Sequence, residues 1–146
     1  MRELLPDGAP LPSADALSDA FAQTLRDGIS IVDDCLLLGK SDAVPRLNAV
    51  RGAVMDKTGY ECFVNHVHTE QRGEAAAVLG QVVAFCTHMS AEAIRIAPNR
   101  SLRFVISKNG KDWAVHFHTL SHESWVSNDL EGYTEEAVLV LDSTEL

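Results

Sequence analysis

The segment LRFVISKNGKDWAVHFHTL, residues 102–120, limits the fold of this chain more than any other stretch. Apolar and polar residues alternate on both sides of Asn109-Gly110. An Asn-Gly pair supplies the two positive-φ positions of a type I′ turn between two strands. The segment therefore predicts a β-hairpin.

A two-residue loop also fixes the register of the hairpin, and with it the two faces. We expect Trp113 opposite Ile106, and His116 opposite Arg103 on the other face. The first face is apolar and is expected to pack on the core, with Leu102, Phe104, Ile106, Trp113, Val115 and Phe117. His118 shares the second face with His116, so both imidazoles are expected to point away from the packed interior.

Three further segments have the spacing of helices. In residues 13–27 apolar side chains recur at three- and four-residue intervals, and Gly28 is placed to end the helix. A second helix is predicted over residues 41–58, with Gly59 after its last turn. Residues 71–96 predict a long third helix that ends before a proline.

Other segments are predicted as strands. Residues 29–38 are apolar and β-branched, which favours a buried strand, with a helix as the alternative. Residues 60–68 alternate and predict a strand with its two histidines on one face. Residues 136–142 predict a final strand, and a short helix capped by Thr134 is the alternative.

These elements predict an α+β fold. It consists of an antiparallel sheet that includes the Asn-Gly hairpin, with one face covered by two to four helices. The 146 residues are the size of one domain, and 46% hydrophobic with 23% charged residues is ordinary globular composition. We therefore expect a single domain over residues 1–146, with residues 1–12 as an extended Pro-rich lead-in.

Nothing in the sequence predicts export or a membrane span. The most apolar stretch, residues 75–89, is interrupted by polar side chains and is shorter than the ~20 apolar residues that cross a bilayer. The N-terminus lacks the continuous apolar region of a secretory signal. Cys35, Cys62 and Cys86 form an odd, widely spaced set, which predicts buried free thiols. We expect a cytoplasmic protein.

The formal net charge of −9 is distributed unevenly along the chain. Residues 1–39 carry seven acids against two bases, residues 40–120 ten bases against seven acids, and residues 121–146 seven acids and no base. The last segment is therefore a local negative field, which repels phosphate backbones and attracts basic protein surfaces. We expect no nucleic-acid binding.

Two aromatic residues lie among these last carboxylates, and together they predict a protein-binding surface. Its expected members are Trp125, Asp129, Glu131, Tyr133, Glu135 and Glu136. Aromatic rings provide area that is desolvated on binding, while the charges speed encounter and set orientation. The favoured interpretation is a small acidic module, without cofactor or catalysis, that neutralises or escorts a basic protein as immunity proteins, inhibitors and chaperones do.

The pattern His-apolar-His-Thr occurs twice, at residues 66–69 and 116–119, and supports an alternative. Two histidines at such spacing on a strand share a face and can ligate one ion. The candidate ligands are His66, His68, His116 and His118, with Glu70 or His122 as a further one. The alternative is a metal-dependent enzyme or metal-binding protein that holds zinc, iron or copper. The favoured interpretation requires instead that the two pairs lie far apart.

Other chemistry has less support in the sequence. It contains no Gly-x-Ser-x-Gly, Walker-type or Gly-x-Gly-x-x-Gly motif, which leaves acyl transfer and nucleotide chemistry without a local basis. A third hypothesis is a pH sensor. In it, the cross-strand pair Arg103 and His116 keeps the imidazole neutral near pH 7 through like-charge repulsion.

Overall fold

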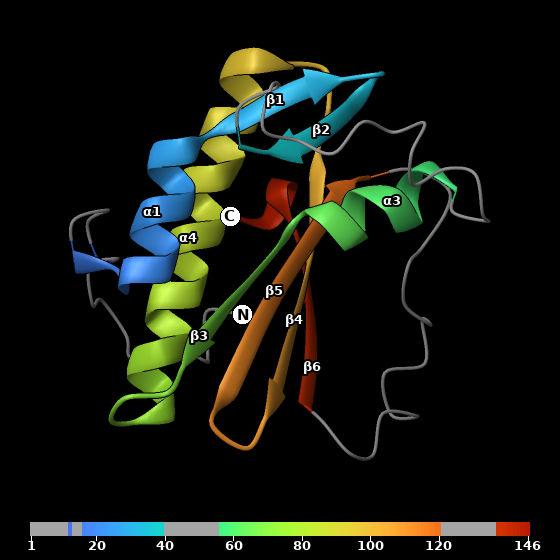
Figure 1. Ribbon diagram of the computed structural model, residues 1–146. Coiled ribbons are helices and arrows are strands. Elements are labelled where there is room, and N and C mark those ends of the chain that lie inside the picture. The colour runs from blue at the N-terminus through green and yellow to red at the C-terminus, as the bar shows by residue number, and fades with distance from the viewer. Residues whose placement is uncertain (1–11, 13–15, 40–55, 121–136) are drawn as a thin grey trace.

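The computed structural model describes residues 12, 16–39, 56–120 and 137–146, and these residues form two antiparallel sheets and three α-helices. In chain order the elements are α1 (Asp19–Asp27), β1 (Ile29–Val32), β2 (Cys35–Leu38), α3 (Lys57–Val64), β3 (His66–Glu70), α4 (Ala75–Ile96), β4 (Leu102–Asn109), β5 (Asp112–Thr119) and β6 (Ala137–Asp142), followed by a short 3-10 helix, Ser143–Glu145. The smaller sheet pairs β1 with β2, and the larger has the strand order β3-β5-β4-β6 (Figure 1). The α+β class with an antiparallel sheet is confirmed.

The helices α1 and α4 form within the segments predicted as helices, residues 13–27 and 71–96, but they begin later, at Asp19 and Ala75. α1 ends at Gly28, whose φ of 73° lies in the left-handed region that glycine adopts without strain. α4 is continuous over 22 residues, and the Ala97 N–H closes it by donating to the Ala93 carbonyl. Pro98 follows at once, as expected for a helix end.

Residues 29–38 form a hairpin instead of the single strand that the sequence favours. β1 and β2 pair antiparallel through all four residues of each strand. The turn residues Asp33 and Asp34 have φ values of 49° and 65°, the two positive values that a type I′ turn requires. Aspartate tolerates this conformation, but the Asp-Asp pair is a weaker turn signal than Asn-Gly. The extended conformation was therefore predictable and the turn was not.

The final strand is also confirmed, since β6 covers Ala137–Asp142 and pairs with β4. The hairpin of residues 102–120 is present as β4 and β5, but its loop is one residue further along the chain than expected. Asn109 pairs with Asp112, so the loop residues are Gly110 and Lys111. Gly110 has a φ of 57°, and glycine at the first loop position is the signature of a type II′ turn.

This loop shifts the register of the hairpin by two residues. Such a shift keeps every side chain on its predicted face but changes each cross-strand partner. Trp113 lies opposite Lys108, and Arg103 lies opposite His118. The expected pairing of Arg103 with His116 is therefore wrong.

The strand predicted over residues 60–68 is wrong in its first half, because α3 occupies it and β3 begins only at His66. Asp56 is the N-cap of α3, and its side chain accepts a hydrogen bond from the Gly59 N–H at 2.6 Å. This cap satisfies one of the first N–H groups of the helix and favours it locally. Gly59 thus lies in the first turn of a helix, and the helix predicted over residues 41–58 falls mostly outside the described residues.

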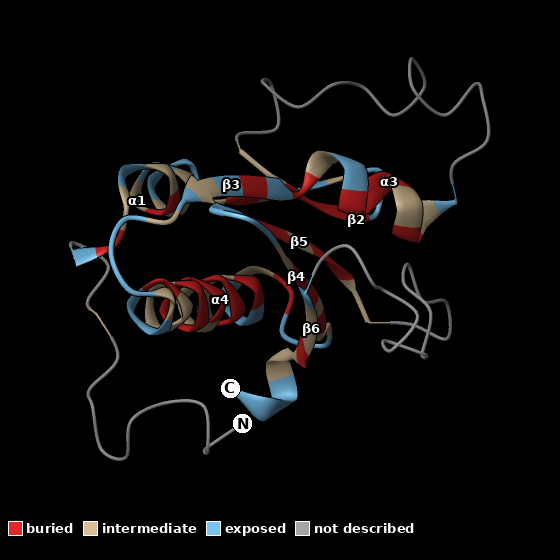
Figure 2. Ribbon diagram, turned by 90° about the horizontal axis from the view of Figure 1, so that it is seen from below, coloured by how far each residue is buried: buried red, intermediate tan, exposed pale blue. Residues whose placement is uncertain are grey.

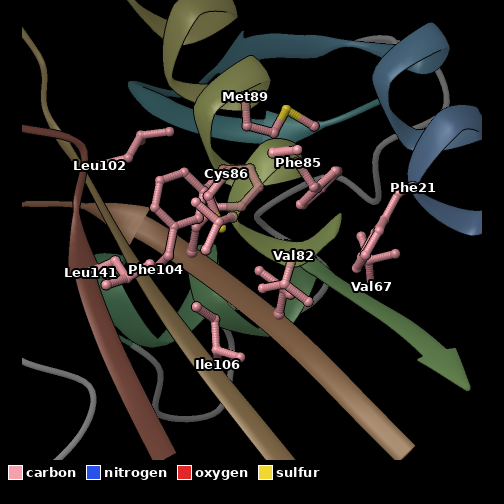
Figure 3. Close-up of a cluster of buried hydrophobic side chains, with 14 of the residues drawn as sticks. Phe21, Val67, Val82, Phe85, Cys86, Met89, Leu102, Phe104, Ile106 and Leu141 are labelled. Carbon is pink, nitrogen blue, oxygen red and sulfur yellow. The ribbon is translucent and has the colours of Figure 1, made fainter. Parts of the chain in front are cut away.

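The main core lies between α4 and one face of the larger sheet, as Figure 3 shows. Phe85 and Met89 of α4 are fully buried, as is Phe104 of β4. Phe21 of α1 stacks on Phe85 with ring centroids 4.5 Å apart, which ties α1 to the same core. The predicted apolar face of the hairpin is buried throughout, with Leu102, Phe104, Ile106, Trp113, Val115 and Phe117.

α4 supplies the helical side of this core. By length and composition alone it is apolar enough to cross a membrane, and it is the one such helix in the described part of the chain. Half of its most apolar 18-residue window is buried inside the protein. A helix that packs in a domain core has the same composition.

A second, smaller cluster lies on the other side of the larger sheet, where Figure 2 shows α3 and β2 above the strands and α4 below them. Cys35 and Leu37 of β2 pack there with Tyr60 of α3, and all three are fully buried. Leu36 between them joins the main core, because alternate strand residues point to opposite sides. The second face of the sheet is therefore covered where β5 meets α3.

Candidate functional site

The predicted partner-binding surface lies outside the described residues. This applies to all of its members, Trp125, Asp129, Glu131, Tyr133, Glu135 and Glu136, and also to the candidate ligand His122. The structure fixes where the segment that carries them joins the sheet. It follows Leu120, whose N–H donates to the Ser101 carbonyl at 2.7 Å, and it precedes Ala137 at the start of β6.

Three of the four predicted metal-ligating histidines lie close together. His66 of β3 is the cross-strand partner of His116 of β5, and their ring centroids are 5.5 Å apart. The ring of His68 lies 5.6 Å from that of His66, at an angle of 86°. The expectation that the two histidine pairs lie far apart is therefore wrong. It failed because β3 pairs with β5, a long-range contact that neither local pattern specifies.

The end of α3 fixes two of these rings. Cys62 and Phe63 lie in its last turn, where carbonyl oxygens lack partners within the helix. The Nδ1–H of His66 donates to the Phe63 carbonyl at 2.7 Å, and the Nδ1–H of His116 donates to the Cys62 carbonyl at 3.1 Å. A carbonyl oxygen only accepts, so the proton is on Nδ1 in both rings.

His68 is held in the same way by a carboxylate. Its Nδ1 lies 3.2 Å from an Asp112 carboxylate oxygen, which again places a proton on Nδ1 because a carboxylate accepts. The side chain of His68 is 55% exposed. With the proton on Nδ1, the Nε2 of the neutral ring is free to accept or to ligate.

His118 is different, because it is fully buried although the sequence expects it to point away from the interior. It does lie on the face opposite the main core, but that face is covered at this end of β5. Its Nδ1–H donates to the Thr119 carbonyl at 2.8 Å, and its Nε2 has no hydrogen-bond partner among the residues that the structure describes. Within the described ranges, no three His, Cys, Asp or Glu side chains are arranged to hold a metal ion.

Arg103 forms an ion pair with Asp142 of β6, not the predicted pair with His116. Two guanidinium nitrogens donate to the two carboxylate oxygens at 2.7 and 2.8 Å. The hydrogen bonds from Arg103 hold the pKa of the Asp142 carboxyl below its usual value. Both side chains are about four-fifths buried, at 23% and 21% exposed. This pair removes the geometry on which the Arg103–His116 pH sensor depended.

Sequence reasoning missed a buried polar network that joins α3 to both sheets. Glu61 is 1% exposed, and its carboxylate accepts from the Leu36 N–H at 2.9 Å, the Thr119 N–H at 2.6 Å and the Thr119 hydroxyl at 3.0 Å. The Asn65 side chain accepts from the Leu38 N–H and donates to the Leu36 carbonyl. Both residues thus bind the free edge of β2. Their spacing of four was the available signal, because it places them on one side of a helix.

Cys62 and Cys86 lack the lowered pKa of an activated nucleophile. Cys35, Cys62 and Cys86 are buried free thiols, as the sequence predicts. Burial, with a smaller contribution from the neighbouring Glu61 carboxylate, raises the pKa of the Cys62 thiol to about 12. Burial likewise raises the pKa of the Cys86 thiol. Both thiols are therefore protonated at neutral pH, and a thiol is a poor nucleophile.

A pocket of about 440 Å³ lies between the start of α1, β3 and the start of α4. Charged side chains of both signs line it, including Asp19, Glu70 and Arg72, and His68 stands at its margin. The Ser18 N–H donates to the Gln81 side chain across one wall at 2.8 Å. The volume is sufficient for a small molecule, and the mixed lining does not select one ligand charge.

Comparisons with known proteins give a family and no relative of known function. No curated protein and no solved structure matches the chain. One family model matches residues 1–146, which is the whole sequence. By that match, the chain belongs to the family described as the Uncharacterized protein PM0498 family.

Proposed function

We propose that this chain is a small acidic protein-binding module of the cytoplasm that recognises a basic protein partner and neutralises or escorts it. The observation that carries the proposal is the charge of residues 121–146, which hold seven acids and no base. A local field of this kind raises the rate at which a basic partner associates and favours one orientation over others.

The negative charge is concentrated outside the described body of the protein. The described residues include twelve acids and eight bases, whereas residues 121–136 contain five acids and no base. Half of those eight bases already have carboxylate partners: Lys57 and Arg100 with Asp34, Arg95 with Glu92, and Arg103 with Asp142. A basic partner is therefore expected to bind residues 121–136 in preference to the body.

The sheet offers this segment a firm support. Residues 121–136 connect β5 to β6, and both of these strands pair with β4 through their whole described length. Binding residues are often carried on segments that a rigid scaffold positions. Trp125 and Tyr133 would provide the area that is desolvated on binding, while Glu131, Glu135 and Asp129 would contact basic side chains.

The proposal is tested by reversing charge in the segment. The variant carries Glu131→Lys, Glu135→Lys and Glu136→Lys. A control with the same change in net charge carries Asp19→Lys, Asp27→Lys and Glu74→Lys, three exposed residues in α1 and directly before α4, all outside residues 121–136. Each protein serves as bait for affinity capture from extract of the native cell at low salt, and captured proteins are identified by mass spectrometry.

We expect a basic protein that is captured by the wild type and the control but not by the segment variant. Its association rate with the segment variant should fall by more than about tenfold at low salt and by less at high salt, because salt screens exposed charges. Circular dichroism should show all three baits folded. An association rate that ignores the reversals, or capture that both triple variants lose equally, contradicts the proposal.

A further inference from the structure

His66 and His68 are both exposed residues of β3. This strand lies at the edge of the larger sheet (Figure 1). The ring centroids of the two histidines are 5.6 Å apart and their planes are nearly perpendicular, at 86°. Two imidazoles that ligate one tetrahedral ion through Nε2, at about 2.0–2.1 Å, have ring centroids about 5 Å apart. The separation of the two rings is therefore close to that of a chelating pair.

We propose that His66 and His68 chelate one late first-row transition-metal ion, of the class of zinc, copper or nickel. Imidazole nitrogen is a suitable ligand for each of these ions. The proposal concerns a site open to solvent, in which two positions are filled by protein nitrogens and the others by water. It is independent of the proposed binding to a basic protein, which depends on a different segment.

Hydrogen bonds already hold both rings in the form that binds a metal. A ligating histidine almost always donates its second ring N–H to a carbonyl or carboxylate, which fixes the tautomer and orients the ring. Here the Nδ1–H of His66 donates to the Phe63 carbonyl, and the Nδ1–H of His68 donates to the Asp112 carboxylate. The unprotonated nitrogen of each neutral ring is then Nε2, which is the ligand atom required.

The charges beside the pair favour a cation. Glu70 lies two residues beyond His68 on the same face of β3, and its cross-strand partner is Asp112. A carboxylate that accepts a hydrogen bond from the Nδ1–H of an imidazole ligating through Nε2 also raises the basicity of that ligand. Both carboxylates are on exposed residues, so they contribute without the cost of a buried charge.

His116 carries the neighbouring imidazole, on the adjacent strand β5. Its ring lies 5.5 Å from that of His66, but the two planes are only 28° apart, as in stacked rings. In the described part of the chain, no three ligand groups converge on one point. The site proposed is therefore a two-histidine site, and a third protein ligand would require the His116 ring to turn.

The test is metal binding to the full chain after removal of bound ions with EDTA and dialysis. Isothermal titration with zinc chloride, and separately with nickel chloride, should give one equivalent bound. His66→Gln and His68→Gln should each weaken the affinity at least tenfold, since each removes one of two ligands. His88→Gln, which alters a histidine of α4 away from β3, should leave the affinity unchanged.

A second measurement locates the ion on the rings. In nitrogen–proton correlation spectra of the side chains, zinc should shift the Nε2 signals of His66 and His68 and leave those of His118 in place. His68→Gln is the safer variant, because its ring is hydrogen-bonded to an exposed carboxylate, whereas His66→Gln removes a bond to α3.

Several results would overturn the proposal. They are no zinc or nickel binding below millimolar concentration, undiminished binding in His68→Gln, or unshifted Nε2 signals for both rings when zinc is bound elsewhere. A loss of metal binding that leaves capture of the basic partner intact would separate this site from the proposed function.

Discussion

The two faces of the four-stranded sheet are built from alternate residues of the same strands. They differ in the interactions that stabilise them. The face toward α4 is apolar and closed by packing, with Phe104 and Phe117 in contact at 5.7 Å between ring centroids. The opposite face carries four histidines, and it ranges from the exposed His68 to the fully buried His118. Packing holds the first face, whereas hydrogen bonds from α3 and β6 hold much of the second.

The largest effect is expected on the packed face. Phe104→Ala should lower the free energy of unfolding by about 3–5 kcal/mol, because it leaves a cavity among fully buried side chains. Urea denaturation measures this loss, provided that the slope of the unfolding free energy against urea concentration is the same in both proteins. The control is Ile94→Ala, at a residue of α4 that is 55% exposed, and it should change the free energy by less than about 0.5 kcal/mol. Similar losses in the two variants would mean that α4 does not pack on this face.

A smaller but still large effect is expected from Glu61 on the second face. Glu61→Ala removes the acceptor of three hydrogen bonds at a residue that is 1% exposed. The loss should be about 2–4 kcal/mol, since donors left buried without acceptors are costly. Glu61→Gln keeps one carbonyl oxygen and should lose about half as much. If Glu61→Ala lowered the free energy of unfolding as little as a surface substitution does, hydrogen bonds to Glu61 would not stabilise this face. Urea denaturation measures the change.

The sequence was sufficient for elements whose signal is local. Alternation and the Asn-Gly pair predicted the hairpin, apolar spacing predicted α4, and residues of high β-propensity predicted β6. It was insufficient where two local signals compete. Residues 60–64 alternate like a strand, but the Asp56 cap and the burial of Tyr60 in the second cluster favour a helix. Which signal prevails depends on contacts with β2 that are far away in the sequence.

At the candidate site, too, the sequence predicted local features but not contacts between distant segments. The pattern His-x-His correctly placed His66 and His68 on one exposed face. Nothing local indicated that His116 would be the cross-strand partner of His66, because the pairing of β3 with β5 is made across the whole of α4. The burial of His118 was equally beyond local reasoning, since it depends on which segments cover that end of the sheet.

The ion pair between Arg103 and Asp142 gives an intermediate effect with a defined pH dependence. Asp142→Asn should cost about 1–2 kcal/mol at pH 7, because it removes a charged acceptor of two hydrogen bonds from a mostly buried pair.

The pKa of Asp142 is lowered in the folded protein by its bonds to Arg103. Its stabilisation is therefore fully present above the pKa of an unfolded aspartate, about 4, and is lost as the pH falls through the lower folded value. Urea midpoints of wild type and variant should converge as the pH is lowered below about 4. If the difference in urea midpoint between wild type and Asp142→Asn did not depend on pH, the pair would contribute only through packing.

The smallest effect on stability is expected at His118, where a buried nitrogen on the second face lacks a hydrogen-bond partner among the described residues. His118→Leu removes a buried Nε2 without a partner in the described part of the chain, a gain of about 1–3 kcal/mol, and loses the bond to the Thr119 carbonyl, a cost of about 0.5–1.5 kcal/mol. The difference in shape between the two side chains opposes the gain further. The free energy of unfolding should therefore change by less than about 1 kcal/mol, or rise slightly, in urea denaturation. A loss above about 2 kcal/mol would show that Nε2 has a partner in solution, and the second face would then be as completely satisfied by hydrogen bonds as the first is by packing.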